Sequence, residues 1–318
     1  MGKIGENGGR LGKMGEYGGR GGRLGKMGKI LCAEKGKRKK EYCVLKKSGI
    51  FAEKNMKITI IGAGNIGGAI ACGIANCNLH HKLEICCADI LTAKLNEIKE
   101  AFPSIHVATD NISAVKDADI VIIAVKPWLV ETVIDEIKEV MDYERQIVIS
   151  VAAGIEFFSL CRYLDKEGVD LPAIFRVIPN TAIAVGESVT FISSCNATKE
   201  QSTLIKSIFD ELGLTIMVEE HLISAGTALA SCGIAYAFRY IRAAVEGAVE
   251  IGINPDLAKK IELQTLRGAV TLLEKNDSHP EVEIDKVTTP GGITIKGLNA
   301  MEEAGFTNAV IKGLKASL

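Results

Sequence analysis

The feature that most constrains this chain is a glycine-rich turn between an apolar run and a run of small residues. The stretch "KITIIGAGNIGGAIACGIA" begins at Lys57 and spaces three glycines as Gly62-x-Gly64-x-x-Gly67. In a strand–turn–helix unit, the first glycine permits a tight turn, the second lets the main chain approach a pyrophosphate, and the third lets helix and strand pack closely. The pattern therefore predicts a strand over 58–61, a helix after it, and a dinucleotide site at the turn.

A second predicted strand, "KLEICCAD", ends in Asp89, which lies 22 residues beyond Gly67. An acid at this place can accept hydrogen bonds from the adenosine ribose hydroxyls, and it repels a 2′-phosphate. Asp89 is equally suited to be the N-cap of a helix predicted over "ILTAKLNEIKEAF". Both interpretations stay open. The first favours NADH, and we keep NADPH or NADH as the predicted cofactor.

The alternation of strands and helices continues along the chain. The segments "ADIVIIAVKP" at 118–127 and "QIVISVAAG" at 146–154 predict buried parallel strands, with a helix over "WLVETVIDEIKEVM" between them. Ligands of open parallel sheets lie outside the carboxyl ends of the strands, so Val125, Lys126 and Ala152–Ala153 should border the cofactor. For Lys126 the commoner alternative is a solvated surface lysine.

The later part of the chain changes from strand to helical periodicity. Strands are predicted at "AIFRVIP", "ESVTFIS" and "LTIMVEE", and only helical patterns follow from about His221. The stretch "HLISAGTALASCGIAYAFRYIRAAVEGAVEIG" predicts one long helix, whose least polar part should be buried. We therefore predict a doubly wound α/β domain over residues 56–220 and an all-helical domain over residues 221–318.

The first 55 residues differ in composition from the rest. They contain 15 Lys and Arg, 5 acidic residues and 14 glycines, whereas residues 56–318 contain 23 basic and 34 acidic residues. Because a segment of this composition buries little apolar surface, it cannot offset the conformational entropy lost on folding. Residues 1–55 are therefore predicted to be a disordered extension. Met56 is then a candidate start, and a basic nucleic-acid-binding arm is the minor alternative. The acidic balance of the remainder argues against a nucleic-acid surface there.

Cysteine and histidine usage bears on metals and on the compartment. The nine cysteines form no CxxC pair, and the five histidines show no HxxxH spacing, so no metal site is predicted. Such thiols are typical of a reducing, cytoplasmic location. Because no uninterrupted apolar run reaches the roughly 18 residues of a membrane span, no membrane partner is expected.

The stretch "DKVTTPGGITIKGL", which begins at Asp285, places two threonines and two glycines ahead of an amphipathic run. A helix start leaves about four backbone N–H groups without internal partners and carries a partial positive charge. The turn could therefore cradle an anion, or it could be an ordinary capped turn. On these residues alone the ordinary turn is favoured.

In their order and separation, several segments resemble the pyrroline-5-carboxylate reductase family over essentially all of 56–318. They are "IGAGNIGGAI", "AVKP", "SVAAGI", "RVIPNTAIAVGE", "ALASCGIAYAF", "HP" at 279–280, "KVTTPGGITIKGL" and "EEAGF". The resemblance implies a Rossmann-type sheet domain, a helical dimerisation domain, a homodimer and a ring of dimers. It also implies NAD(P)H-dependent hydride transfer to the C=N bond of 1-pyrroline-5-carboxylate, which gives L-proline in the last step of proline biosynthesis.

The same resemblance implies site residues. Those expected to line the cofactor, together with Asp89, are Ile61, Gly62, Ala63, Gly64, Asn65, Ile66, Gly67, Asn111, Ala124, Val125, Lys126, Pro127, Val151, Ala152 and Ala153. Those expected to face the substrate are Glu220, Thr289, Gly291, Gly292, Ile293 and Thr294. Backbone N–H groups from Gly291 to Thr294 would hold the substrate carboxylate, and Thr294 is the candidate catalytic residue beside the ring nitrogen.

The chain departs from the family pattern in a few places. Cys232 and Ile234 stand where the family usually has serine and proline, and Ala182 replaces another proline. A β-hydroxyacid dehydrogenase is the nearest enzymatic alternative, but the run 224–252 lacks the lysine expected on its interdomain helix. Two more functions stay open: reduction of a different cyclic imino acid, and non-catalytic sensing of a dinucleotide.

Overall fold

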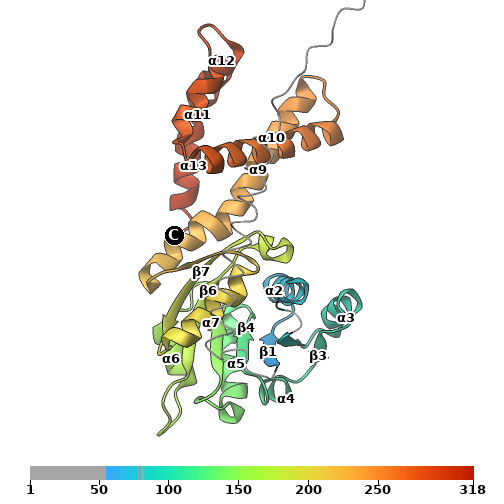
Figure 1. Ribbon diagram of the computed structural model, residues 1–318, viewed down its shortest axis with the longest axis vertical. Helices are drawn as coiled ribbons and strands as arrows, with labels where there is room; N and C mark the ends of the chain where they lie inside the picture. The colour runs from blue at the N-terminus through green and yellow to red at the C-terminus, as the bar shows by residue number, and fades with distance from the viewer. Residues whose placement is uncertain (1–54, 78, 80–81) are drawn as a thin grey trace, which may run out of the picture. The chain divides into compact units, whose positions relative to one another are not determined.

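The computed structural model describes residues 55–77, 79 and 82–318. The predicted disorder of residues 1–55 falls, except for Asn55, outside the described residues. Within them, the chain forms the predicted sheet domain followed by helices alone, so the predicted fold class is confirmed (Figure 1).

Eight strands form one sheet in the order β3-β2-β1-β4-β5-β6-β7-β8. Strands β1 to β6 all run parallel to one another in the sheet. Strand β7 runs antiparallel to β6, and β8 is parallel to β7. The order reverses between β1 and β4, which is where an open α/β sheet binds its ligand. The bounds are β1 Met56–Ile61, β2 Leu83–Ala88, β3 His106–Ala108, β4 Ile120–Ile123, β5 Ile147–Ser150, β6 Ala173–Ile178, β7 Ser188–Cys195 and β8 Gly213–Met217.

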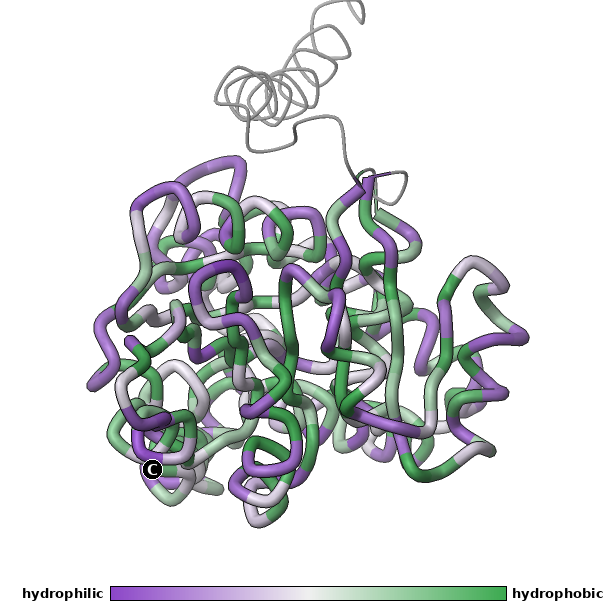
Figure 2. The backbone as a smooth tube through the Cα atoms, turned by 90° about the horizontal axis from the view of Figure 1, so that it is seen from below, coloured by the Kyte–Doolittle hydropathy of each residue, from purple (hydrophilic) through white to green (hydrophobic). Residues whose placement is uncertain are grey.

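The central strands β4, β5 and β6 are buried at every residue. Their apolar side chains pack against α5 (Val130–Ile137) and α6 (Phe157–Leu164) in a core cluster that includes Val121, Val148 and Leu160. Along the tube, green apolar stretches alternate with purple polar ones (Figure 2), as amphipathic helices on a buried sheet require. The helical elements here are α2 Asn65–Asn76, α3 Thr92–Ala101, α4 Asn111–Val115, η2 Pro127–Leu129, α5 Val130–Ile137, η3 Lys138–Val140, α6 Phe157–Leu164, η4 Thr181–Val185 and α7 Lys199–Asp210.

The helical part begins directly after β8. Its helix starts are encoded locally: Asn254 accepts a hydrogen bond from the Asp256 N–H ahead of α10, and Pro255 occupies the first helical position. The elements are η5 Glu220–Leu222, α8 Ile223–Gly226, η6 Thr227–Cys232, α9 Gly233–Glu250, α10 Pro255–Asn276, α11 Pro280–Val287, α12 Ile293–Glu303 and α13 Phe306–Lys315.

The long helix predicted from His221 forms, with two differences from expectation. It contains a π-helical turn, η6, between α8 and α9. It is also not buried in the single chain, since α9 has no buried residue and Phe238 is 60% exposed. An apolar helix without cover in its own chain needs another surface to pack against.

By length and composition, the helix Glu220–Glu250 could span a membrane, with 17% of its most apolar window buried. Counting uninterrupted apolar residues missed this, because Ser, Thr and Gly break the run without lowering the mean hydropathy enough. The amino-terminal half of the helix nevertheless packs on the sheet: a side chain at Gly226 would lie 2.8 Å from the Phe191 ring of β7.

Candidate active site

The glycine-rich turn between β1 and α2 is closed by main-chain contacts. A Cβ on Gly67 would lie 1.9 Å from the carbonyl oxygen of Gly62, and one on Gly62 would lie 2.7 Å from that of Ala124. Gly62 also has a φ of +103°, which favours glycine. These glycines therefore seat the turn against the start of α2 and the end of β4, as the spacing predicted.

The middle glycine is different, and it tests whether a dinucleotide fits. A Cβ on Gly64 would meet nothing within 4 Å, and both Gly64 and Asn65 are exposed. Gly64 is the N-cap of α2 and makes no side-chain cap, and no acidic residue lies in the first turn. Open space beside Gly64 and a helix start with no acidic residue in its first turn suit a pyrophosphate.

Asp89 follows β2 and reaches back to this turn. Its Oδ2 atom accepts a hydrogen bond from the Ala63 N–H at 2.6 Å, and Oδ1 accepts one from the Leu91 N–H at 2.8 Å. The N-cap position of α3 belongs to Leu91 and has no side-chain cap, so the helix-capping interpretation of Asp89 is wrong. Asp89 instead fixes the glycine-rich turn to the end of β2, as a half-buried carboxylate at the cofactor edge.

The ends of β4 and β5 lie beside the same turn. The Ala124 N–H donates to the Ile61 carbonyl oxygen at 2.8 Å, and the Val151 N–H donates to that of Ile123 at 3.1 Å. Lys126 and Ala153 are exposed, whereas Ala152 is buried. The structure thus gathers nearly all the predicted cofactor residues at one sheet edge: Ile61, Gly62, Ala63, Gly64, Asn65, Ile66, Gly67, Asp89, Ala124, Val125, Lys126, Pro127, Val151, Ala152 and Ala153.

Two predicted site residues are engaged in contacts that sequence did not foresee. Asn111, the first residue of α4, donates from Nδ2 to Oε2 of Glu136 at 2.9 Å. Glu220 accepts at Oε1 from Nη1 of Arg176 and from the Phe157 N–H, both at 2.7 Å. Their roles toward ligands remain predictions.

Arg176 was missed by the sequence analysis. It is 4% exposed, and within the described part of the chain its buried Nε atom has no hydrogen-bond partner. Its pairing joins β6 to the first turn of the helical part, which keeps a buried charge neutralised. The signal in the sequence was a single arginine within the otherwise apolar strand "AIFRVI".

The Thr-Thr-Pro-Gly-Gly turn opens α12, as predicted. Gly292 is its N-cap without a side-chain cap, and Gly291 has a φ of +72°. Within the described residues, the side chains of Thr289 and Thr294 make no hydrogen bond, and Ile293 is 86% exposed. The Gly292 N–H donates to the Thr289 carbonyl oxygen at 2.9 Å, so both the anion cradle and the ordinary turn stay open as predictions.

Four of the described cysteines are shifted away from the thiolate form. Burial raises the pKa of Cys87 to about 12, and burial also raises the pKa values of Cys72, Cys86 and Cys161. A raised pKa disfavours the thiolate, which is the nucleophile. Among the residues that the structure describes, no group of three or more His, Cys, Asp and Glu could hold a metal ion.

Comparison with known proteins agrees with this arrangement. Residues 220–318 match the family described as "Pyrroline-5-carboxylate reductase dimerisation", and residues 57–154 match "NADP oxidoreductase coenzyme F420-dependent".

Similar proteins extend the match to both parts of the chain. "Pyrroline-5-carboxylate reductase 1" of Dictyostelium discoideum is 39% identical over 82% of this chain, which spans only 48% of that protein. "Pyrroline-5-carboxylate reductase 2" of the same organism is 36% identical, over 83% of this chain and 92% of its own length. The crystal structure of Plasmodium falciparum pyrroline carboxylate reductase with NADP bound has a TM-score of 0.74 at 27% identity, covering 83% of this chain and 96% of that one. From its glycine-rich turn to its last helix, this chain belongs to the pyrroline-5-carboxylate reductase family.

Proposed function

We infer that this chain reduces 1-pyrroline-5-carboxylate to L-proline with a nicotinamide dinucleotide. The observation that carries this is the presence, in one family member, of two helix starts without a side-chain cap. One, at α2, opens from the glycine-rich turn, and the other, at α12, opens from the Thr-Thr-Pro-Gly-Gly turn. The first suits the cofactor pyrophosphate and the second suits the substrate carboxylate.

The residues of the chain act mainly by binding and orientation. The N–H groups of Gly291, Ile293 and Thr294 hold the carboxylate, with the hydroxyls of Thr289 and Thr294, and Thr294 lies beside the ring nitrogen. The Gly292 N–H, which the sequence also predicted as a donor, is used within the turn by the Thr289 carbonyl oxygen. The imine is basic enough to bind as an iminium cation, so no strong acid is required of the protein. The reduced nicotinamide, when bound, supplies the hydride. Positioning then supplies much of the rate enhancement.

Asp89 bears on the choice of cofactor. Two backbone N–H groups hold its carboxylate in place beside the glycine-rich turn. A fixed negative charge favours ribose hydroxyls and disfavours a 2′-phosphate, so we propose a preference for NADH over NADPH. The Asp89→Ser variant should shift the ratio of kcat/KM values toward NADPH. An unchanged ratio would remove Asp89 from cofactor selection.

We further propose a homodimer formed through α9 to α13. These helices leave large apolar side chains exposed, including Phe238 and Ile293. A second copy would cover them, and it would remove the need for a lipid surface around Glu220–Glu250. A ring of such dimers and a cytoplasmic location are further proposals from the resemblance. Light scattering on wild type and on Phe238→Asp tests the interface, and a monomeric wild type would refute it.

The decisive assay uses protein that starts at Met56. Oxidation of NADH, and separately of NADPH, is followed with pyrroline-5-carboxylate and with its six-membered homologue. Turnover of the five-membered imine supports the proposal. Faster turnover of the six-membered ring would favour the alternative imino acid, although one methylene in a pocket is worth only about 1–3 kcal/mol. Cofactor binding without turnover of either imine would favour a dinucleotide sensor.

A further inference from the structure

Two cysteines that lie far apart in the sequence meet on one face of the sheet. Cys161 belongs to α6, and its side chain packs against the core cluster that contains Ile174 of β6. Ile174 lies directly opposite Cys195 in the antiparallel pairing of β6 and β7, so both side chains project from the same face. Helix α6 therefore places Cys161 over the end of β7, beside Cys195.

The two thiols are in contact. Burial raises the pKa of the Cys161 thiol, and the neighbouring Cys195, which hydrogen-bonds its side chain, raises it further. Both cysteines are free thiols in this structure. Because their sulfur atoms already lie within hydrogen-bonding reach, a small movement of the side chains brings them to the roughly 2.0 Å of a disulfide bond.

Cys195 is the thiol of the pair that a small oxidant can reach. It is half-buried and lines an open cavity of about 530 Å³, together with Phe157 of α6 and Met217 of β8. Phe157 lies one helical turn before Cys161, on the same side of α6. The cavity therefore opens beside the pair and gives a solvent-borne molecule access to the Cys195 sulfur.

A second group of thiols lacks this access. Cys87 lies near Cys72 and Cys86, but it is 0% exposed. Its pKa is raised to about 12, mainly by burial and to a lesser extent by the neighbouring thiols. A thiol that is both protonated and shielded from solvent reacts slowly with oxidants. The accessible cavity distinguishes Cys195 from this group.

We propose that Cys161 and Cys195 form a reversible dithiol–disulfide pair that a peroxide oxidises. The Cys195 sulfur attacks hydrogen peroxide: an S–O bond forms, the O–O bond breaks, and the departing oxygen leaves as water with the Cys195 proton. The Cys161 sulfur then attacks the Cys195 sulfur: the S–S bond forms, the S–O bond breaks, and the second oxygen leaves as water with the Cys161 proton. Two thiols thus lose two electrons, and one peroxide becomes two water molecules.

The disulfide would tie α6 to β7 and close a loop that contains all of β6. Closing such a loop restricts the unfolded chain, so the oxidised protein should unfold at a higher temperature than the reduced one, by about 5 °C or more. In compartments that keep most thiols reduced, disulfides of this kind are usually transient and redox-sensing.

The test uses the full chain, first reduced and then treated with hydrogen peroxide. Remaining thiols are alkylated, and the protein is digested with trypsin without reduction. Cys161 and Cys195 are each the only cysteine of their tryptic peptides, 146–162 and 177–199. We expect mass spectrometry to show these two peptides linked as the main oxidised species, and dithiothreitol to separate them.

Serine variants assign the two roles. Cys161→Ser should leave Cys195 as a sulfenic acid that dimedone traps, and it should abolish the rise in Tm on oxidation. Cys195→Ser should leave Cys161 reduced. The matched control is Cys86→Ser: Cys86 is also half-buried, but its side chain lies near Glu84 and Lys57. This variant should keep both the linked peptide and the rise in Tm.

Peroxide-treated, folded wild type without the linked peptide would overturn the proposal. So would a disulfide that joins Cys195 to a cysteine other than Cys161, or a rise in Tm that persists in Cys161→Ser. If a serine variant does not fold, the peptide map of the wild type decides alone. None of these measurements uses imine reduction, so the result is independent of the proposed function.

Discussion

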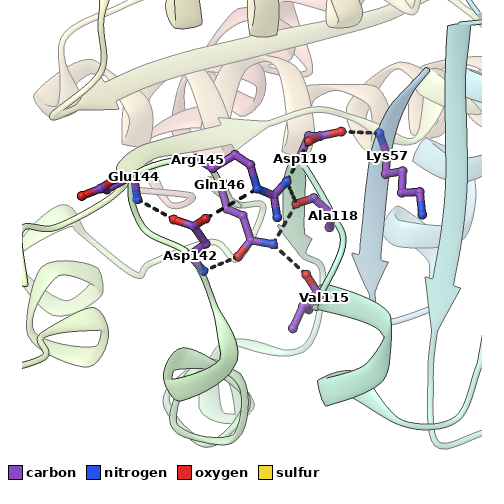
Figure 3. Close-up of polar contacts among 8 residues, drawn as sticks. All are labelled: Lys57, Val115, Ala118, Asp119, Asp142, Glu144, Arg145 and Gln146. Carbon is purple, nitrogen blue, oxygen red and sulfur yellow. Dashed lines mark hydrogen bonds and ion pairs between the residues drawn. The ribbon is translucent and has the colours of Figure 1, made fainter. Parts of the chain in front are cut away.

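The two edges of the parallel strands contain opposite chemistry. At the amino edge, before β4 and β5, charged and polar side chains pair with one another and with the main chain (Figure 3). Nη1 of Arg145 donates to Oδ1 of Asp119 at 2.8 Å and to the Ala118 carbonyl oxygen at 2.9 Å. The other oxygen of Asp119 accepts from the Lys57 N–H of β1 at 2.8 Å.

Gln146 completes this edge. It is 1% exposed, and its Nε2 atom donates to the carbonyl oxygens of Val115 and Ala118 at 2.7 and 2.8 Å. Its Oε1 atom accepts from the Asp142 N–H at 2.9 Å. All the hydrogen-bonding groups of this buried amide are used within the protein, so nothing remains to bind a ligand.

At the carboxyl edge the corresponding groups are left open. Gly64 and Asn65 are exposed, and α2 begins without a side-chain cap. Within the described part of the chain, the Lys126 ammonium has no ion pair or hydrogen bond and is exposed. One edge of the sheet thus stabilises the fold, whereas the other leaves its donors available for an anionic ligand.

The largest expected effect comes from Gly67, where the open edge depends on close packing. In Gly67→Val the new Cβ would lie 1.9 Å from a main-chain oxygen, so the turn must move. We expect a loss of at least about 4 kcal/mol in the free energy of unfolding, together with loss of cofactor binding. Gly68→Ala is the control, because its Cβ would lie 3.4 Å from the nearest atom. Urea unfolding and cofactor titration measure both quantities, and equal effects in the two variants would contradict this account.

The Gln146→Leu variant tests whether the amino edge of the sheet, before β4 and β5, serves stability alone. The substitution removes the side-chain donor to the Val115 and Ala118 carbonyl oxygens and the acceptor for the Asp142 N–H, which should cost about 1–3 kcal/mol of unfolding free energy. Cofactor affinity, measured on the folded variant, should stay unchanged. Glu144→Gln, on the same loop but exposed, should change neither quantity. Weakened cofactor binding in Gln146→Leu would show that the two edges are coupled.

The Gly64→Ala variant tests whether the carboxyl edge of the sheet binds the cofactor pyrophosphate. Its Cβ would meet nothing within 4 Å in the protein, so stability should be unaffected. The methyl group instead occupies the approach of the pyrophosphate, and we expect cofactor affinity to fall about tenfold, or about 1.4 kcal/mol. Calorimetric titration with NADH and NADPH measures this. Unaltered affinity for both would place the pyrophosphate elsewhere.

Some strands of the sheet could be predicted from the sequence and others could not, because only some have a local signal. The strand predicted over 58–61 is observed as Met56–Ile61, because the apolar run and the glycine spacing are local signals. The short strand His106–Ala108 was not predicted, since it pairs over three residues at the sheet margin and carries no apolar run. Likewise, no local signal shows that β7 runs antiparallel to β6.

The site shows the same limit. The glycine-rich turn and the start of α12 could be predicted, because their chemistry lies within a few residues. The second partner of Asp89, the Ala63 N–H, lies 26 positions away, and the Ser231 hydroxyl of the π-helical turn donates to the Pro179 carbonyl oxygen, 52 positions upstream. Contacts of that range are set by the folded sheet, and a single sequence does not display them.

The smallest expected effect concerns a helix that starts at the amino edge. Ahead of α7, the Thr198 hydroxyl accepts from the Gln201 N–H at 3.2 Å, and Oε1 of Gln201 accepts from the Thr198 N–H at 2.8 Å. This reciprocal cap occupies the donors that α2 leaves free. Thr198→Ala should therefore cost about 1 kcal/mol in the free energy of unfolding, and Thr198→Ser should restore most of it. Cofactor affinity should not change in either variant. A cap whose removal altered cofactor binding would mean that helix starts at both edges contribute to one site, and the division between a structural and a binding edge would fail.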